Sequence, residues 1–343
     1  MRIHNNNDSL DKNIALVVPT IREEQILLFI DSWEEQLKEA KVKFYIVEDN
    51  ERPSFNINID KNSNIEHLTW SDAPSELLSC INVKSPCCRQ IGFWKAYNDG
   101  FDVIITLDDD TRPVAGKNLF NQFAQILLNG IPVWVDPMIN YRSRGYPEKN
   151  TGNMPIHFHI GSFLSIPDVD GETQLKYQNE FNSNPPQYMP RVTLLSNKQL
   201  IPVNGGICGF RKEMVPFIHY TLWNKELKYR RFDDIWMGII LKRFFDLTNF
   251  NMSYGPPFVN HIRASDPNKN ILYEVEGKKW NEDFWIQFDK KLEQYVKGID
   301  RTPDFIYEQI CLSLESMGNN WAVEEGIAMR MWKKLFAKSK VPQ

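Results

Sequence analysis

The pattern of apolar and polar positions in the first half of the chain predicts strands and helices in alternation. Short apolar runs rich in β-branched residues are typical of buried strands. They occur at residues 14–18, 42–47, 103–107 and 132–135. Stretches with apolar side chains at helical spacing separate them, at 23–40, 85–97 and 116–129. This order predicts an α/β fold with a mostly parallel, Rossmann-like sheet and helices on both of its faces.

The second half of the chain is less regular and predicts long loops followed by helices. Residues 141–160 and 171–198 are polar and contain Asn, Pro and Gly, which is typical of loops. Residues 201–211 are rich in glycine and resemble a pair of short strands. Helical spacing returns toward the end of the chain. We therefore expect one α/β domain over residues 1–280 and a helical extension over residues 281–343.

Three consecutive carboxylates, Asp108, Asp109 and Asp110, directly follow the apolar strand at 103–107. In open α/β sheets, ligands bind beyond the carboxyl ends of the strands. Three acids there repel one another and resist desolvation unless a cation lies among them. Oxygen ligands suit Mg²⁺ or Mn²⁺, and these ions usually share their coordination shell with substrate phosphates. A solvated turn that caps the next segment is the simpler alternative, but the fully apolar strand before the acids favours a metal site.

Bulk composition limits the classes of function and location. The formal net charge of −4 gives no general reason to expect nucleic acid as a partner, although a local basic groove remains compatible with it. The five cysteines lack CxxC spacing and are odd in number, so free thiols in a reducing compartment are expected. The polar N-terminus lacks the apolar core of a signal peptide, and no apolar stretch reaches membrane-spanning length. We expect a cytoplasmic protein without a membrane span.

Polar residues also follow the first two predicted strands, and the three strand ends would meet at one edge of the sheet. Pro19, Thr20 and Arg22 follow the first strand, and Asp49 follows the second. Together with Asp109 they could bind the base, ribose and sugar of a nucleotide, although Asp49 is an equally good turn residue. Lys84 and Arg89 flank the start of the next helix. They could face phosphate, or they could simply lie on a solvated helix surface.

Three further features are candidates for chemistry. Asp233 and Asp234 precede an apolar helix, where they could cap it or could orient and deprotonate a sugar hydroxyl. His261 is a candidate metal ligand, but a lone histidine is more often structural. The pair Gly205-Gly206 does not fit a dinucleotide fingerprint and would let the backbone approach a sugar closely.

Several stretches of the chain, taken in order, resemble the reversibly glycosylated polypeptides. These are also called UDP-arabinopyranose mutases, and they have a glycosyltransferase A-type fold. The matching stretches are VVPTIRE (17–23), VKSPCCRQIGF (83–93), VIITLDDD (103–110), RGYP (144–147), IGSFLSIPDVDGETQL (160–175), IPVNGGICGFRKEM (201–214), RRFDDIWMG (230–238) and HIRASDP (261–267). Each motif is short, but the ordered set is specific.

The resemblance implies a UDP-sugar substrate and a divalent metal, Mn²⁺ or Mg²⁺, held by Asp108 and Asp110. It also implies that Arg144 matches the arginine associated with reversible glycosylation and mutase activity. A second family arginine falls here on Thr151. That departure argues against self-glycosylation more than against mutase activity. A guanidinium stays protonated, so a bidentate clamp on the diphosphate is an alternative role for Arg144.

Two enzymatic hypotheses follow. The first is a mutase that releases UDP, lets the sugar change its ring size and recaptures UDP. The second is a metal-dependent glycosyltransferase, in which Asp233 or Asp234 handles an acceptor hydroxyl of a glycan, a protein or a modified nucleic-acid base. A non-catalytic subunit is disfavoured, because the acidic triplet is retained. An apolar stripe on the last helix (Trp321, Met329, Trp332, Leu335) is expected to pack on the chain's own core, and a homo-oligomer is the alternative.

Overall fold

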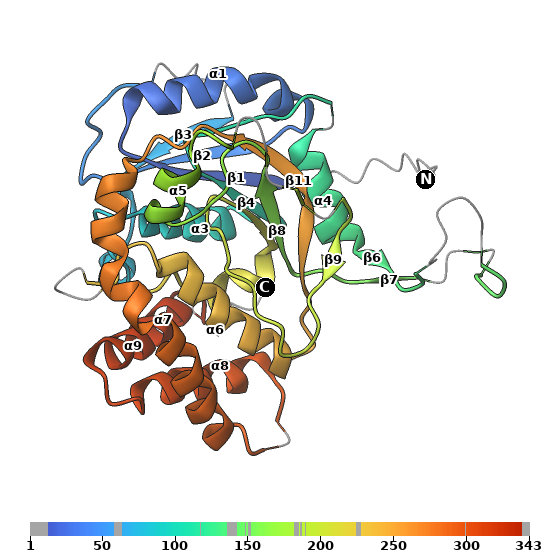
Figure 1. Cartoon of the computed structure of the whole chain (residues 1–343), viewed down its shortest axis with the longest axis vertical. Helices are drawn as coiled ribbons and strands as arrows, with labels where there is room; N and C mark the ends of the chain where they lie inside the picture. Colours follow the sequence, from blue (N-terminus) through green and yellow to red (C-terminus); the bar gives the residue numbers. More distant parts are fainter. Residues whose placement is uncertain are drawn as a thin grey trace.

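The computed structural model gives one central sheet with helices on both faces (Figure 1). It describes residues 13–57, 64–116, 118–135, 143–147, 149, 152–181, 185, 187–188, 190–223, 228–298 and 300–337. The strands of its main sheet are β1 (Ile14–Thr20), β2 (Lys43–Glu48), β3 (Ile65–Leu68), β4 (Val103–Leu107), β5 (Thr111–Arg112), β8 (Phe158–Phe163), β9 (Thr193–Leu194), β10 (Ile207–Arg211) and β11 (Met252–His261). A separate ribbon pairs β6 (Ile131–Pro132) with β7 (Asn153–Met154).

The sheet order explains how the strand ends come together. The order is β3-β2-β1-β4-β10-β8-β11-β5, with β9 paired to β11. The first four strands are parallel, β10 runs antiparallel to both neighbours, and β8 and β11 are parallel again. The predicted α/β fold with a mostly parallel sheet is therefore confirmed, with one antiparallel strand at its centre.

Alternation along the strands divides the apolar side chains between two cores. In β1, Ile14, Leu16 and Val18 face one core, whereas Ala15 and Val17 face the other. The first core is completed by α1 (Glu23–Glu39) and α4 (Leu119–Asn129). The second is completed by α3 (Arg89–Asn98), by the 3-10 helix η3 (Lys212–Phe217) and by the C-terminal helices (Figure 1). Continuous apolar strands are thus expected, because both faces of the sheet are buried.

The C-terminal helices pack on the second core. They are α6 (Asp233–Leu247), α7 (Pro267–Tyr295), α8 (Pro303–Glu315) and α9 (Asn320–Ala337). Trp321, Met329 and Trp332 of α9 are almost fully buried in this core, which confirms that the apolar stripe packs on its own chain. The division at residue 280 stays a prediction, and residue 280 lies inside α7, so such a boundary would divide a continuous helix.

Some short elements differ from the sequence-based expectation. The strand expected at 132–135 is limited to β6, and the expected strand pair at 201–211 is the single strand β10. The loop expected at 171–198 begins with α5 (Gly171–Tyr177), which Asp170 caps by accepting the N–H of Thr173. Elements of two to seven residues are too short to show a period, so the pattern could not reveal them. The remaining short helices are η1 (Trp70–Asp72), α2 (Ser75–Leu78) and η2 (Pro86–Cys88).

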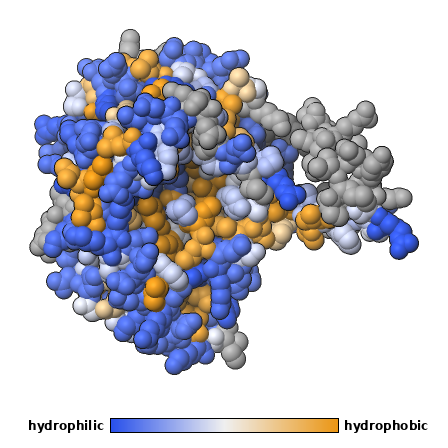
Figure 2. Space-filling model, in the orientation of Figure 1, coloured by the Kyte–Doolittle hydropathy of each residue, from blue (hydrophilic) through white to orange (hydrophobic). Residues whose placement is uncertain are grey.

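Hydrophilic side chains cover most of the face seen in Figure 2, and apolar side chains gather over α7. The exposed apolar residues of that helix are Leu272, Tyr273, Val275 and Ile286. Within the described segments, no helix is long and apolar enough to cross a membrane.

Candidate functional site

The carboxyl ends of β1, β2 and β4 meet at one edge of the sheet. β1 lies between β2 and β4, and all three run parallel. The chain first proceeds from β1 to β2 and β3, and then crosses to the other side of β1 to form β4. Such a change of direction opens a crevice beyond the strand ends, and ligands of α/β proteins bind in this kind of crevice. Thr20 and Asp108 lie on its two sides, as the sequence predicts.

The first side of the crevice is built around Asp109. Its carboxylate accepts the hydroxyl of Thr20 at 2.7 Å and Nε of Arg22 at 3.2 Å, and it also pairs with the Nη2 atom of Arg22. The same Nη2 lies 3.8 Å from Asp110. Asp109 is buried, whereas the side chain of Arg22 is 36% exposed. The guanidinium of Arg22 thus lies at the edge of the crevice, paired with Asp109 and partly open to solvent.

Asp108 is held from below by Arg89. Nη2 of Arg89 donates to Oδ1 of Asp108 at 2.7 Å. Its other nitrogens donate to the carbonyls of Pro86 and Gly205 and to the hydroxyl of Thr106. Arg89 is buried and Asp108 is 36% exposed at its side chain. The structure thus directs Arg89 into the protein, so a direct contact with phosphate would require it to give up one of these bonds.

The two glycines before β10 allow the backbone to approach the acids. A Cβ at Gly206 would lie 2.5 Å from Oδ2 of Asp108, and a Cβ at Gly205 would lie 3.2 Å from Cβ of Asp234. The N–H of Gly205 donates to Oδ2 of Asp234 at 2.8 Å. The sequence suggested that these glycines approach a sugar. In the structure, Gly206 approaches the carboxylate of Asp108, and Gly205 approaches the ring of Tyr220 and the side chain of Asp234.

Asp110 and His261 form a pair on the far side of the crevice. Nε2 of His261 lies 3.5 Å from Oδ1 of Asp110, and the N–H of Ala264 donates to the other oxygen at 2.9 Å. Nδ1 of His261 lies 3.0 Å from the carbonyl of Ile166. A carbonyl only accepts, so Nδ1 carries a proton. Burial lowers the pKa of His261, but the hydrogen bond and charge of Asp110 outweigh it and raise the pKa above its ordinary value, which favours a proton on Nε2 as well.

The structure separates the roles of the two acids at the start of α6. Asp233 is buried, and its carboxylate accepts Nε1 of Trp223 at 3.1 Å and lies 3.5 Å from the thiol of Cys87. Asp234 accepts the N–H groups of Gly205 and of its own neighbour, and is only partly covered. Burial, followed by the negative charge of Asp233, raises the pKa of Asp234 to about 8. Asp234 is therefore able to hold a proton at neutral pH.

Asp49 lies at the end of β2 and is tied to the loop before α3. Its Oδ1 accepts the N–H of Lys84 at 2.8 Å and Nε1 of Trp70 at 2.9 Å. Burial raises its pKa to about 6 despite these donors. The ammonium-bearing side chain of Lys84 is exposed. Lys84 adopts a left-handed conformation, with φ of 59°, which only a constrained loop imposes on such a residue.

Among the described residues, no hydrogen bond or ion pair joins Arg144 to the acids of the crevice. Arg144 is exposed in the turn at 143–147, where the N–H of Tyr146 donates to the carbonyl of Ser143. It has no ion pair with another described residue. Thr151 lies outside the described residues. The catalytic role of Arg144 therefore stays a prediction from the resemblance.

Asp168 is a residue of the crevice that the sequence did not single out. Its side chain is 43% exposed, and it lies within electrostatic reach of Asp108 and Asp234. Desolvation of the carboxyl group raises the pKa of Asp168, and the charges of Arg263 and Arg231 oppose that rise. Arg263 donates to the carbonyls of Pro167 and Val169 at 2.9 and 2.5 Å, which fixes the loop that carries Asp168. The stretch PDVDGE contains three acids, Asp168, Asp170 and Glu172, and sequence alone does not show which one faces the crevice.

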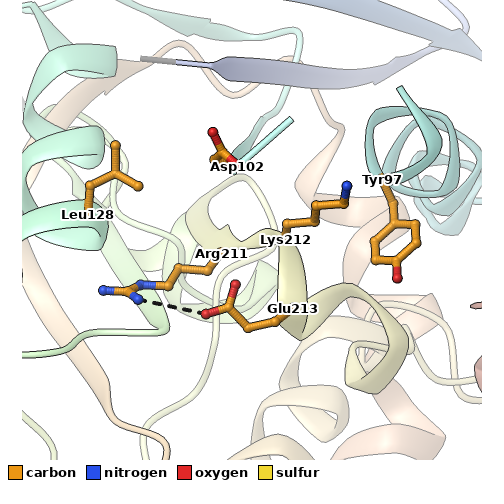
Figure 3. A pocket seen from close by; sticks show the side chains of 6 residues that line it. All are labelled: Tyr97, Asp102, Leu128, Arg211, Lys212 and Glu213. Carbon is orange, nitrogen blue, oxygen red and sulfur yellow. Dashed lines mark ion pairs between the residues drawn. The ribbon is translucent and has the colours of Figure 1, made fainter. Parts of the chain in front are cut away.

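An open pocket of about 360 Å³ lies at the opposite end of the sheet (Figure 3). It is lined by Asp102, which precedes β4, by Arg211, which ends β10, and by Glu213, which pairs with Arg211 at 3.7 Å. The length of β4 separates this pocket from Asp108, so it does not belong to the crevice.

The chain is similar to proteins of one family over most of its length. Residues 9–340 match the family described as reversibly glycosylated polypeptide. "Probable UDP-arabinopyranose mutase 4" of Arabidopsis thaliana is 29% identical over 291 residues, which cover 80% of this chain and 76% of the relative. "UDP-arabinopyranose mutase 3" of Arabidopsis thaliana is 30% identical and covers 80% of this chain and 77% of the relative. "UDP-arabinopyranose mutase 1" of Oryza sativa subsp. japonica is 27% identical, with 80% and 76% covered.

Among solved structures, the catalytic domain of Drosophila β1,4-galactosyltransferase 7 is 14% identical, with a TM-score of 0.34, and covers 74% of this chain and 71% of that chain. The family match spans nearly the whole sequence and includes the acidic triplet and the C-terminal helices. The chain belongs to the reversibly glycosylated polypeptide family.

Proposed function

We propose that this protein is a UDP-arabinopyranose mutase, which interconverts the pyranose and furanose forms of a UDP-sugar. One observation carries the proposal: Asp108, the Asp110–His261 pair and Asp234 converge on the crevice of a chain that belongs to this family. The names of its relatives support the choice of reaction.

We further propose that Asp108, Asp110 and His261 hold a divalent cation, Mn²⁺ or Mg²⁺. Among the described residues, no cluster of three or more such ligands is preassembled. The pair of Asp110 and His261 nevertheless fits a metal, because Nε2 lies 3.5 Å from a carboxylate oxygen and a cation could replace the proton between them, while the carbonyl of Ile166 holds the proton on Nδ1. Substrate phosphates would complete the coordination. When bound, the cation would neutralise the charge that develops on the departing diphosphate.

The chain's own residues supply the remaining functions. Arg22 lies at the mouth of the crevice with one third of its side chain exposed, and it is oriented by Asp109 toward a bound diphosphate. Asp49 would accept a hydrogen bond from the base or the ribose. A change of ring size also requires proton exchange between two sugar hydroxyls. Asp234, with a pKa of about 8, and the neighbouring Asp168 can hold and release these protons.

The first experiment is incubation of the purified protein with UDP-arabinopyranose and Mn²⁺ without an acceptor, followed by chromatography of the nucleotide sugars. We expect a second UDP-sugar of equal mass that does not form in the presence of EDTA. Accumulation of UDP alone would contradict the mutase assignment and would favour a glycosyltransferase that uses a glycan, protein or nucleic-acid acceptor.

Location and assembly stay predictions. The five cysteines are free and buried, as expected of a chain in a reducing compartment such as the cytoplasm. The apolar surface of α7 is a candidate for contact with a second copy, which analytical ultracentrifugation would test.

A further inference from the structure

A buried histidine–glutamate hydrogen bond joins α9 to the segment that precedes α6. His219 and Glu325 have no exposed side-chain surface, and Nδ1 of His219 lies 2.8 Å from Oε1 of Glu325. Nε2 of His219 donates to the carbonyl of Cys80 at 2.7 Å, and Oε2 of Glu325 accepts the N–H of Leu222 at 2.8 Å. Desolvation of a carboxylate is costly, so a glutamate in an apolar helix interface depends on all of these partners.

Two tryptophans of α9 hold the same segment by hydrogen bonds. The indole N–H of Trp321 donates to the carbonyl of Leu222, and that of Trp332 donates to the carbonyl of Val215 at 2.9 Å. Apolar packing alone is tolerant of small shifts, whereas these bonds fix the backbone of residues 215–222 in one position.

The segment fixed by α9 in turn contacts Asp233. The N–H of Thr221 donates to the carbonyl of Asp233 at 3.1 Å, and Nε1 of Trp223 donates to its carboxylate at 3.1 Å. Asp233 is the first residue of α6 and is directly followed by Asp234. A movement of the segment would therefore move the start of α6 and the carboxylate of Asp234.

The same segment also supports Asp108. The ring of Tyr220 lies 5.2 Å from the guanidinium of Arg89, which donates to Asp108. The N–H of Tyr220 donates to the side chain of Gln90 at 3.0 Å, next to Arg89 in α3. Asp108 and Asp234 are thus both supported by the segment that α9 holds through hydrogen bonds.

We propose that α9 is a positioning element of the active site. Glu325 and His219 are positioning residues that act on Asp108 and Asp234 through residues 215–223, the segment that precedes α6. The proposal rests on the proposed function for the identity of the reaction. Neither residue touches a substrate. Their effect arises because displacement of a catalytic group by about 1 Å is enough to reduce turnover strongly.

Glu325→Leu, Glu325→Gln and Arg330→Gln test the proposal together. Leucine removes both acceptors. Glutamine keeps the network, because its carbonyl can accept from Leu222 while its amide donates to Nδ1 of His219. Arg330 is the matched control, because it also forms ion pairs in α9, but with Glu308 and Glu315 on the side of α8. The readouts are hydrogen exchange of the Gly205 amide, which reports on Asp234, and the kinetics of UDP-arabinopyranose conversion.

For Glu325→Leu we expect faster exchange at Gly205 and a kcat lowered by about tenfold with little change in KM. Glu325→Gln should restore both readouts, and Arg330→Gln should leave both unchanged. If Glu325→Leu does not fold, Trp321→Phe removes one bond to Leu222 and should act in the same direction with a smaller effect. Unchanged exchange and kcat in Glu325→Leu, or equal losses in Arg330→Gln, would overturn the proposal. If the wild type converts no UDP-sugar, the proposed function fails, while exchange at Gly205 still decides the positioning role.

Discussion

Gly206→Ala perturbs the acidic strand end by a defined distance. The added Cβ would lie 2.5 Å from Oδ2 of Asp108, whereas ordinary contact begins at 3.4 Å, so the carboxylate must retreat by about 0.9 Å. The φ angle of Gly206 lies outside the left-handed region, so alanine adds no backbone strain. The group that must move is the end of a side chain that is 36% exposed, and it can turn toward solvent.

We expect a large loss of activity with a small loss of stability. A displacement of about 1 Å of a catalytic group costs about 100-fold. A 100-fold loss of kcat/KM corresponds to an activation free energy that is higher by about 2.7 kcal/mol. The cost in stability should be about 1 kcal/mol, at the lower end for overpacking, because Asp108 has room to move. Conversion of UDP-arabinopyranose at saturating Mn²⁺ measures the first quantity, and urea unfolding measures the second.

Gly209→Ala, in the strand β10 that follows Gly206, is the matched control. Its Cβ would lie 2.7 Å from Cδ1 of Phe123, within the core under α4 and away from the carboxylates. This variant should lose stability and retain kcat/KM per folded molecule. The reasoning is refuted if folded Gly206→Ala converts the substrate as fast as the wild type, or if Gly209→Ala loses as much activity.

Three further predictions concern the acids and Arg144. The pKa of Asp234 is raised by burial from the unfolded value of about 3.9 to about 8, so its stabilising contribution is complete at low pH and is lost as the pH rises through 8. The Tm of Asp234→Asn should therefore fall less between pH 5 and pH 9 than the Tm of the wild type. Asp168→Asn should lower kcat/KM about tenfold without destabilising the fold, because the residue is partly exposed and faces like charges. Arg144→Ala should abolish interconversion and leave Tm unchanged, because its side chain is exposed.

Each of these predictions has a control or a contradicting result. Parallel curves of Tm against pH for wild type and Asp234→Asn would contradict the first. For the second, Asp170→Ala should lose about 1 kcal/mol of stability, because Asp170 caps α5, and should keep its activity. The opposite pattern would place the functional acid at Asp170. For the third, Lys149→Ala is the control, because Lys149 is exposed and close to Arg144 in the sequence. Equal effects of the two substitutions would count against a specific role for the arginine.

The sequence predicts the sheet-forming half of the molecule well, because its strands are buried on both faces. Continuous apolar runs such as Val103–Leu107 have no other stable placement than between two layers of helices, and the acids that follow must lie at the sheet edge. The start of α7 is less visible from periodicity, although Asp266 and Pro267 provide a cap and a first helical residue. The amphipathic periodicity of α7 is weak, so the sequence pattern did not predict its first turns.

Only the tertiary structure decided which polar residues share the crevice and which support it. The sequence identified Asp108, Asp110, His261 and Asp234 by type and position, but it could not show that Arg89 is buried beneath Asp108 or that Asp233 faces inward. Those outcomes depend on contacts between segments more than 100 residues apart, such as the bond from Arg89 to Gly205. Local pattern records whether a side chain can be buried. The partners that it meets there are fixed by how the strands are ordered in the sheet, and that order is a property of the whole chain.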